Sequence, residues 1–150
     1  MTYGWAILVV MIVGIVMWQL GIFNPGGTQA TTMQGFGAVK PQLAGTGLSS
    51  DGQFTGTFLN AGGASIQVKK VKVVMEEPTT ESASTDAHSN AATWEANANQ
   101  HILATFSVGG LGNPDAGESY SASVEVTYEV RIGGTTVTRK SSGILRGPIE

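Results

Sequence analysis

Two isolated histidines, His88 and His101, are the only imidazoles in the sequence. His88 follows Asp86 by two residues, which gives a weak indication of a metal site, and a solvated loop histidine explains the same pair more simply. His101 likewise stands alone. The histidines therefore predict neither a metal centre nor a general base.

Carboxylates occur in two closely spaced pairs. Asp115 and Glu118 lie in the segment NPDAGES, which could bind a calcium ion, although ordinary turn chemistry accounts for the same residues. Glu125 and Glu129 fall on one face of a predicted strand, with Thr127 between them. A general acid–base pair needs one carboxyl in a desolvated site, so we interpret this pair as a charged, exposed face.

Motifs for covalent or nucleotide chemistry are missing from the sequence. It has no cysteine, no G-x-S-x-G nucleophile elbow and no phosphate-binding G-x-x-x-x-G-K-[ST] loop. The net charge of −3 provides no basic surface for nucleic acid. We therefore expect neither enzymatic activity nor a metal, a cofactor or a nucleic-acid partner.

The N-terminal segment is the strongest feature of the sequence. From Tyr3 to Phe23 the only strongly polar side chain is Gln19, and the first charged residue of the chain is Lys40. As a helix, these 21 residues would be roughly 31 Å long, close to the roughly 30 Å thickness of a bilayer core. Three interpretations compete: a cleavable secretory signal, a transmembrane anchor, and a helix that leaves the membrane to pack against copies of itself.

The residues of this segment favour the third interpretation. A secretory signal would have a basic n-region and an A-x-A-like cleavage site, and an anchor usually has flanking Lys or Arg. A helix that is apolar all round must be surrounded completely, and small residues allow helix backbones to approach closely. Gly14 and Gly21 lie seven residues apart, near one face. The expected polymerisation surface comprises Tyr3, Trp5, Ala6, Ile7, Val10, Gly14, Trp18, Gln19 and Gly21.

The opening residues MTYGWAILVV, followed by a polar β-rich region, resemble archaeal type IV pilins of the class III signal-peptide kind. The match is specific from Tyr3 to Leu8 and general for the rest of the helix; the family's glutamate near the start of its helix has no counterpart, since position 5 is Trp. The resemblance implies processing by a prepilin peptidase, a membrane-inserted state before assembly, and dedicated pilus assembly machinery.

A hinge is predicted directly after the apolar segment. Pro25 ends or kinks a helix and restricts Asn24 before it, and Gly26 and Gly27 allow a change of direction. We therefore expect three parts: a polymerisation or transmembrane helix at 1–23, a hinge and extended linker at 24–35, and a globular domain at 36–150.

Alternating apolar and polar residues predict that the globular domain is all-β. The clearest strand is YSASVEVTYEVRI at 120–132, and Gly133-Gly134 then supplies a two-residue hairpin turn into TTVTRKSSGIL. Upstream strands place Phe54 and Phe58 on one face, and Ile66 and Val68 inward before a change of phase at Lys69-Lys70 that indicates a β-bulge. A further strand presents Ile102, Ala104, Phe106 and Val108 on one face. The expected fold class is α+β, a long N-terminal hydrophobic helix followed by an immunoglobulin-like β-sandwich.

A long polar segment, Glu76 to Gln100, is predicted as a surface loop with one short strand around Trp94. It is either a solvated excursion or an outward-facing recognition surface. N-glycosylation is disfavoured because no N-x-[ST] sequon occurs. O-linked sugars have candidate acceptors in this segment at Thr79, Thr80, Ser82, Ser84 and Thr85.

These features together predict a pilin-like structural subunit of an extracellular helical filament at the cell surface, which polymerises with itself through its N-terminal helix and serves adhesion. The alternative is a single-pass membrane protein whose extracellular β-sandwich binds a ligand or a cell-wall component. A detergent-resistant polymer supports the first prediction, and a detergent-soluble monomer supports the second.

Overall fold

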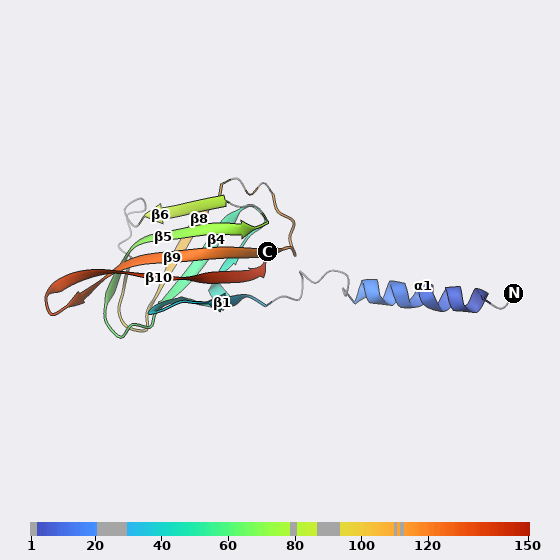
Figure 1. The fold of residues 1–150 in the computed structure, drawn as a ribbon, viewed down its shortest axis with the longest axis horizontal. Coiled ribbons are helices and arrows are strands. Elements are labelled where there is room, and N and C mark those ends of the chain that lie inside the picture. The colour runs from blue at the N-terminus through green and yellow to red at the C-terminus, as the bar shows by residue number, and fades with distance from the viewer. Residues whose placement is uncertain (1–2, 21–29, 79–80, 87–93, 110, 112) are drawn as a thin grey trace.

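A computed structural model of the chain describes residues 3–20, 30–78, 81–86, 94–109, 111 and 113–150 (Figure 1). One helix, α1 (Gly4–Gln19), stands apart from a β-domain that contains all the strands of the described part. The expected combination of an N-terminal helix and a β-rich domain is thereby confirmed.

Ten strands and a short 3-10 turn make up the β-domain. In chain order these are β1 (Thr32–Gln34), β2 (Val39–Pro41), η2 (Leu43–Gly45), β3 (Gly47–Leu48), β4 (Gln53–Asn60), β5 (Ile66–Glu77), β6 (Glu81–Asp86), β7 (Trp94–Ala96), β8 (His101–Ser107), β9 (Ser119–Ile132) and β10 (Thr135–Pro148).

The strands form two antiparallel sheets. The larger sheet has the order β1-β10-β9-β5-β6, with β7 also paired to β5, and the smaller sheet joins β2, β3 and β8 to β4. β8 pairs with the whole of β4 from Gln53 to Leu59, so β2 and β3 must share the opposite edge of β4. Side chains of both sheets belong to one buried cluster, which gives a sandwich-like arrangement.

Period-2 alternation places the core residues as the sequence predicts. Phe54 and Phe58 of β4 are buried, and so are the apolar positions of β9 from Tyr120 to Val130. Ile66 and Val68 point into the core before a register shift between Val68 and Lys70, after which the inward positions are Val71 and Val73. The predicted bulge is therefore confirmed. Ile102, Ala104 and Val108 are buried as expected.

The hairpin of β9 and β10 is the longest element of the larger sheet. Its strands pair from Thr135–Ile132 to Pro148–Ser119, and the turn residues Gly133 and Gly134 have φ of 58° and 86°. Two positive φ angles define the type I′ turn, which glycine adopts without steric cost. The predicted turn is confirmed.

Three details of the prediction are wrong. The alternation of the strand predicted at 120–132 assigns its last residue, Ile132, to the core face, yet Ile132 is half exposed because the hairpin continues beyond the buried part of the sheet. The segment from Glu76 to Gln100 was expected to be mainly a loop, yet Glu81–Asp86 forms β6 along the edge of β5. Within the range expected as a linker, Thr32–Gln34 forms β1, which pairs with β10 at Ile144–Arg146.

Candidate assembly surface

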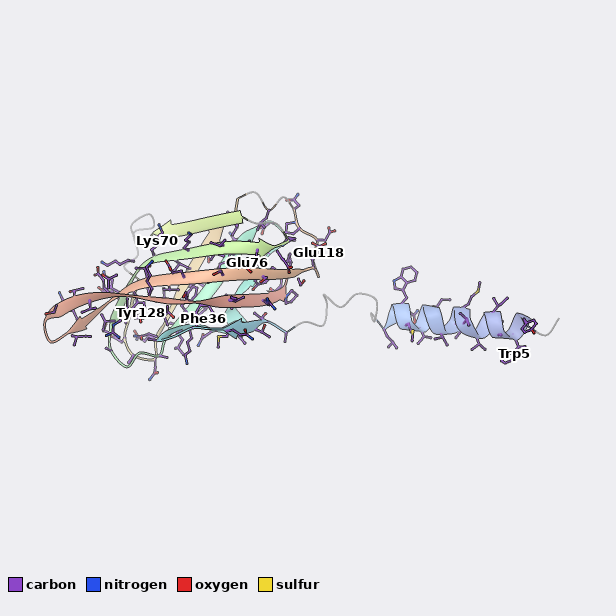
Figure 2. The ribbon with its side chains drawn as sticks, in the orientation of Figure 1. Trp5, Phe36, Lys70, Glu76, Glu118 and Tyr128 are labelled. Carbon is purple, nitrogen blue, oxygen red and sulfur yellow. The ribbon has the colours of Figure 1, made fainter. Side chains whose placement is uncertain are left out.

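The helix α1 leaves its apolar side chains in solvent. None of its residues is buried, and Figure 2 shows side chains projecting from it along its whole length, with Trp5 near its start. Trp5 and Trp18 are 72% and 77% exposed, and Val10 is 71% exposed. Soluble monomers rarely expose a continuous apolar surface of this kind, so such surfaces mark contacts with another protein or with lipid.

The composition of α1 makes the same point. Seven of its 16 residues are Val or Ile, which lose side-chain freedom in a helix. An isolated helix of this length is marginal in water even with good helix formers. The first turn has no acidic residue and the last turn has no basic one, so charges do not stabilise its ends. The helix must therefore obtain its stability from whatever covers it.

Gly14 lies in the middle of α1, where glycine costs about 1 kcal/mol relative to alanine. A Cβ built at Gly14 or at Gly4 meets no atom within 4 Å. No contact within the described chain therefore requires glycine at either position. Close approach of another backbone is a physical reason to keep a glycine on the face of such a helix.

Gln19 is the last residue of α1, and its side chain is the only strongly polar one in the helix. It is exposed and makes no hydrogen bond to another described residue. The helix C-terminus is closed by the backbone alone, where Leu20 N–H donates to the carbonyl of Val16 at 2.9 Å. Within the described residues the Gln19 amide has no partner, and its side chain carries both donors and an acceptor.

The other predicted assembly residues fall into two groups. Tyr3 and Ile7 are exposed, and Ala6 is half exposed, on the same helix as Trp5, Val10, Gly14 and Trp18. Gly21 and the hinge residues Asn24, Pro25, Gly26 and Gly27 lie outside the described residues. Within the part of the chain that the structure describes, no helix is both long and apolar enough to cross a membrane.

The candidate sugar acceptors lie at the edge of the larger sheet or beyond the described chain. Three of them lie in β6, which is a strand rather than the expected loop: Ser82, Ser84 and Thr85. Thr79 and Thr80 lie outside the described residues. Modification at any of these positions stays a prediction.

The residues considered for chemistry do not gather into a site. Asp115 and Glu118 belong to a turn in which Glu118 N–H donates to the Asp115 carbonyl at 3.2 Å. Glu125 and Glu129 each pair with a lysine, Lys140 at 3.0 Å and Lys69 at 3.2 Å, on the outer face of the sheet. This agrees with the interpretation of an exposed, charged face.

His101 is exposed at the start of β8, whereas His88 lies outside the described residues. Among the residues with a described position, no three His, Asp or Glu side chains come together as a metal site would require. The only strong shift of a tyrosine or carboxyl pKa in that set concerns Tyr120, whose pKa is raised to about 12 by burial and, secondarily, by the Glu150 carboxylate. Tyr120 is a buried core residue.

Two buried polar side chains connect elements of the β-domain, and no pattern in the sequence indicates either of them. Asn60, at the end of β4, donates from Nδ2 to the carbonyls of Ala64 and Ala96 at 2.7 and 3.0 Å. Ser141 of β10 accepts from Gly37 N–H and donates to the Val39 carbonyl, so it fixes the chain where it crosses from one sheet to the other. Short polar residues within strand patterns carry no periodic signal, which explains why they were missed.

No protein-family model matches the sequence, and the curated proteins contain no similar chain.

Proposed function

We propose that this protein is a pilin-like structural subunit of an extracellular helical filament, in which α1 forms the core and the β-domain forms the outer layer. The observation that carries the proposal is Gly14, which no contact in the described chain explains, at the centre of a helix whose apolar side chains are all uncovered. Close packing of identical helices accounts for both features, since it buries every face of α1 and uses the space at Gly14.

The partition of charge supports the same arrangement. All 19 charged residues follow position 39, so the helix and the segment after it can be enclosed without burying an ionised group. Identical subunits related by a rotation that does not close on itself assemble into an open helical polymer. The chain requires no cofactor or catalytic group for such a role.

The finer features of the proposal follow from the resemblance to archaeal type IV pilins. In this view the two sheets are an immunoglobulin-like sandwich on a helical stalk, residues 24–27 act as the hinge, and adhesion at the cell surface is the filament's task. Prepilin peptidase and assembly machinery would act on the subunit while α1 is held in the cytoplasmic membrane.

Electron microscopy of material sheared from cells that produce the chain together with pilus assembly machinery tests this proposal. We expect filaments that persist in mild detergent and whose subunit is this chain, identified by peptide mass fingerprinting. A chain that is recovered only as a detergent-soluble monomer would contradict the filament and would support the membrane-anchored binding protein instead.

A further inference from the structure

The outer edge of β10 is only partly covered. β10 pairs with β9 along its whole length, whereas β1 pairs with it only at Ile144, Leu145 and Arg146. The next stretch, Ser141 to Gly143, lies beneath the turn at Gly35–Gly37, which is held by the hydrogen bond from Gly37 N–H to Ser141 Oγ at 3.0 Å. On the side away from β9, Thr135 to Lys140 has no strand beside it among the described residues. All six residues are exposed.

This six-residue segment, which we call the free edge, is well suited to strand pairing. The tight Gly133-Gly134 turn makes Ile132–Thr135 the first hydrogen-bonded pair of the hairpin. The N–H and C=O groups of Thr136, Thr138 and Lys140 therefore point away from β9. Thr-Thr-Val-Thr favours extended structure, and an exposed edge of this kind is a template for another strand.

The opposite edge of the same sheet is formed by β6, Glu81–Asp86. β6 pairs with β5 from Lys70 to Met75, and in the described part of the chain no strand lies on its other side. β6 has the same length as the free edge. It begins and ends with an acidic residue and contains no basic one, whereas the free edge contains Arg139 and Lys140 and no acidic residue.

We propose that the free edge of one subunit pairs with β6 of a second copy, so that the larger sheet continues from subunit to subunit. The order β10-β9-β5-β6 is antiparallel at every step, so β10 and β6 run in opposite directions within one copy. Copies that share one orientation then meet as an antiparallel pair. Residues that are directly opposed must lie on the same face of the continuous sheet, and Arg139, which is level with Tyr128, lies on the same face as Glu81, which is level with Met75. In the register that follows, Arg139 lies opposite Glu81 and Thr135 lies opposite Thr85.

This register makes neighbouring subunits staggered. Within one copy Glu81 is level with Leu145, through Met75 and Ala122. Pairing Glu81 with Arg139 of the neighbour displaces the two copies by six residues, or about 20 Å along the strands. Without the stagger the free edge would face β7, which has only three residues. A heterologous contact with a displacement along the strands leads to an open helical array rather than a closed dimer.

The competing occupant is the free edge of the second copy itself. That contact would be isologous and would give a closed dimer. It would bring Arg139 and Lys140 of both copies into one interface, in which the two free edges supply no carboxylate. Charge complementarity therefore favours β6, and the two contacts differ in which pair of residues comes into reach.

Disulfide trapping distinguishes these contacts, because the natural chain has no cysteine. Full-length Arg139→Cys and Glu81→Cys chains are prepared separately in the same detergent, mixed at high concentration and oxidised. Directly opposed residues of an antiparallel pair have Cα atoms about 4.5–5.5 Å apart, within the range of a disulfide. We expect a disulfide-linked dimer in the mixture and at least about tenfold less in either chain alone.

A backbone variant tests whether strand pairing causes the crosslink. Thr138→Pro in the Arg139→Cys chain removes an outward N–H without removing a hydrogen bond to β9, and proline is tolerated on edge strands. We expect it to reduce the dimer at least about tenfold, whereas Thr138→Ala, which keeps the N–H, leaves the yield unchanged. Circular dichroism of every variant checks that the sheet is retained.

Absence of a dimer from the mixture would overturn the inference, as would an Arg139→Cys dimer that forms equally well alone. In these samples detergent covers α1, so the crosslink reports the contact between sheets whether or not the helices polymerise. Failure of the filament proposal and failure of this inference are therefore separate results.

Discussion

Tyr120 is the residue at which burial and ionisation are most directly linked. Its side chain is 1% exposed, and its hydroxyl has no hydrogen-bond partner among the described residues. Burial, reinforced by the Glu150 carboxylate, raises the pKa of Tyr120 to about 12 from an ordinary value of 10.0. The folded protein therefore holds this proton more tightly than the unfolded chain does.

We predict that the free energy of unfolding includes a contribution from Tyr120 that is complete below pH 10 and is lost as the pH rises from 10 to about 12, since only the unfolded chain has then released the proton. Two pKa units correspond to about 3 kcal/mol. Tyr120→Phe should remove this part of the pH dependence. It should also stabilise the protein at neutral pH by about 1 kcal/mol or more, because an unpaired buried hydroxyl is eliminated.

Urea unfolding of both chains between pH 7 and 12 measures the effect, and the lysines and remaining tyrosines cancel in the comparison. Parallel pH profiles for the two chains would contradict the assignment of the shift to Tyr120.

Ser141 offers a second prediction at the residue scale. It is 3% exposed, and its Oγ lies 3.0 Å from Gly37 N and 2.7 Å from the Val39 carbonyl oxygen. Ser141→Ala leaves both backbone groups without this partner, which should lower the free energy of unfolding by about 2 kcal/mol. Ser142→Ala, on the exposed side of the same strand, is the control and should change stability by less than about 0.5 kcal/mol. Equal effects of the two substitutions in urea unfolding would show that the two hydrogen bonds of Ser141 do not contribute to stability.

At the scale of elements, α1 has no residue buried by the rest of the described chain. We predict that Gly14→Leu blocks polymerisation, because a side chain placed on the close-packing face holds neighbouring backbones apart. The circular dichroism of the β-domain should be unchanged, since no described residue approaches Gly14. Ile12→Leu, a change that conserves volume, is the matched control and should assemble normally. Electron microscopy shows whether each variant forms filaments. Normal filaments from Gly14→Leu would refute the close-packing argument.

Gln19 tests whether the end of α1 is enclosed. In a filament core its amide should hydrogen-bond to a neighbouring group, and Gln19→Lys should abolish filaments because an ammonium there would be buried without a partner. In a simple membrane anchor a lysine near the helix end can reach the interface without harm. Gln19→Met, which removes the amide without adding charge, should assemble with reduced stability. If the Gln19→Lys protein were functional and localised to the membrane, the result would support the membrane anchor and contradict the filament.

Alternation made the long strands predictable, and local chemistry made the turn predictable. β9 alternates over its buried length, and Gly133-Gly134 permits few structures other than a tight hairpin. β6, with the sequence ESASTD, has no such signal, since it contains no alternation of large apolar and polar residues, and it is a strand because β5 offers it an edge. Ile132 shows the converse limit: periodicity assigns a face to a residue, but only the length of the opposing sheet decides whether that face is covered.

Of the two surfaces proposed for assembly, the apolar helix could be predicted from the sequence, whereas the free edge of β10 could not. An apolar, charge-free run needs no tertiary information to be recognised, so Trp5, Gly14 and Gln19 could be selected from the sequence. The free edge of β10 depends on where β1 stops pairing, at Ile144, and on the turn that covers Ser141 to Gly143. These are long-range contacts, and a single sequence does not specify them.

On the scale of the whole molecule, the boundary between stalk and β-domain lies before β1 rather than after it. Thr32–Gln34 pairs with Ile144–Arg146, and the glycine at position 143 leaves room for the Gln34 carbonyl and the Phe36 ring, both of which a Cβ there would meet at under 3 Å. Gly147 is similarly close to Thr31. The segment next to the stalk is therefore part of the sheet, so a fragment beginning at residue 36 lacks a strand that the β-domain uses.

We predict that residues 30–150, produced without α1, fold as a soluble β-domain with a cooperative thermal transition, because both sheets and the entire buried cluster lie within them. Residues 36–150 should also show β-structure, with a free energy of unfolding lower by about 1–3 kcal/mol, since three ladder positions are lost and the edge of β10 is opened as far as Arg146. Circular dichroism and urea unfolding of the two fragments measure the difference. If the longer fragment gave the spectrum of an unfolded chain, the β-domain would require its filament neighbours to fold, and contacts between subunits would complete its core as well as extend its sheet.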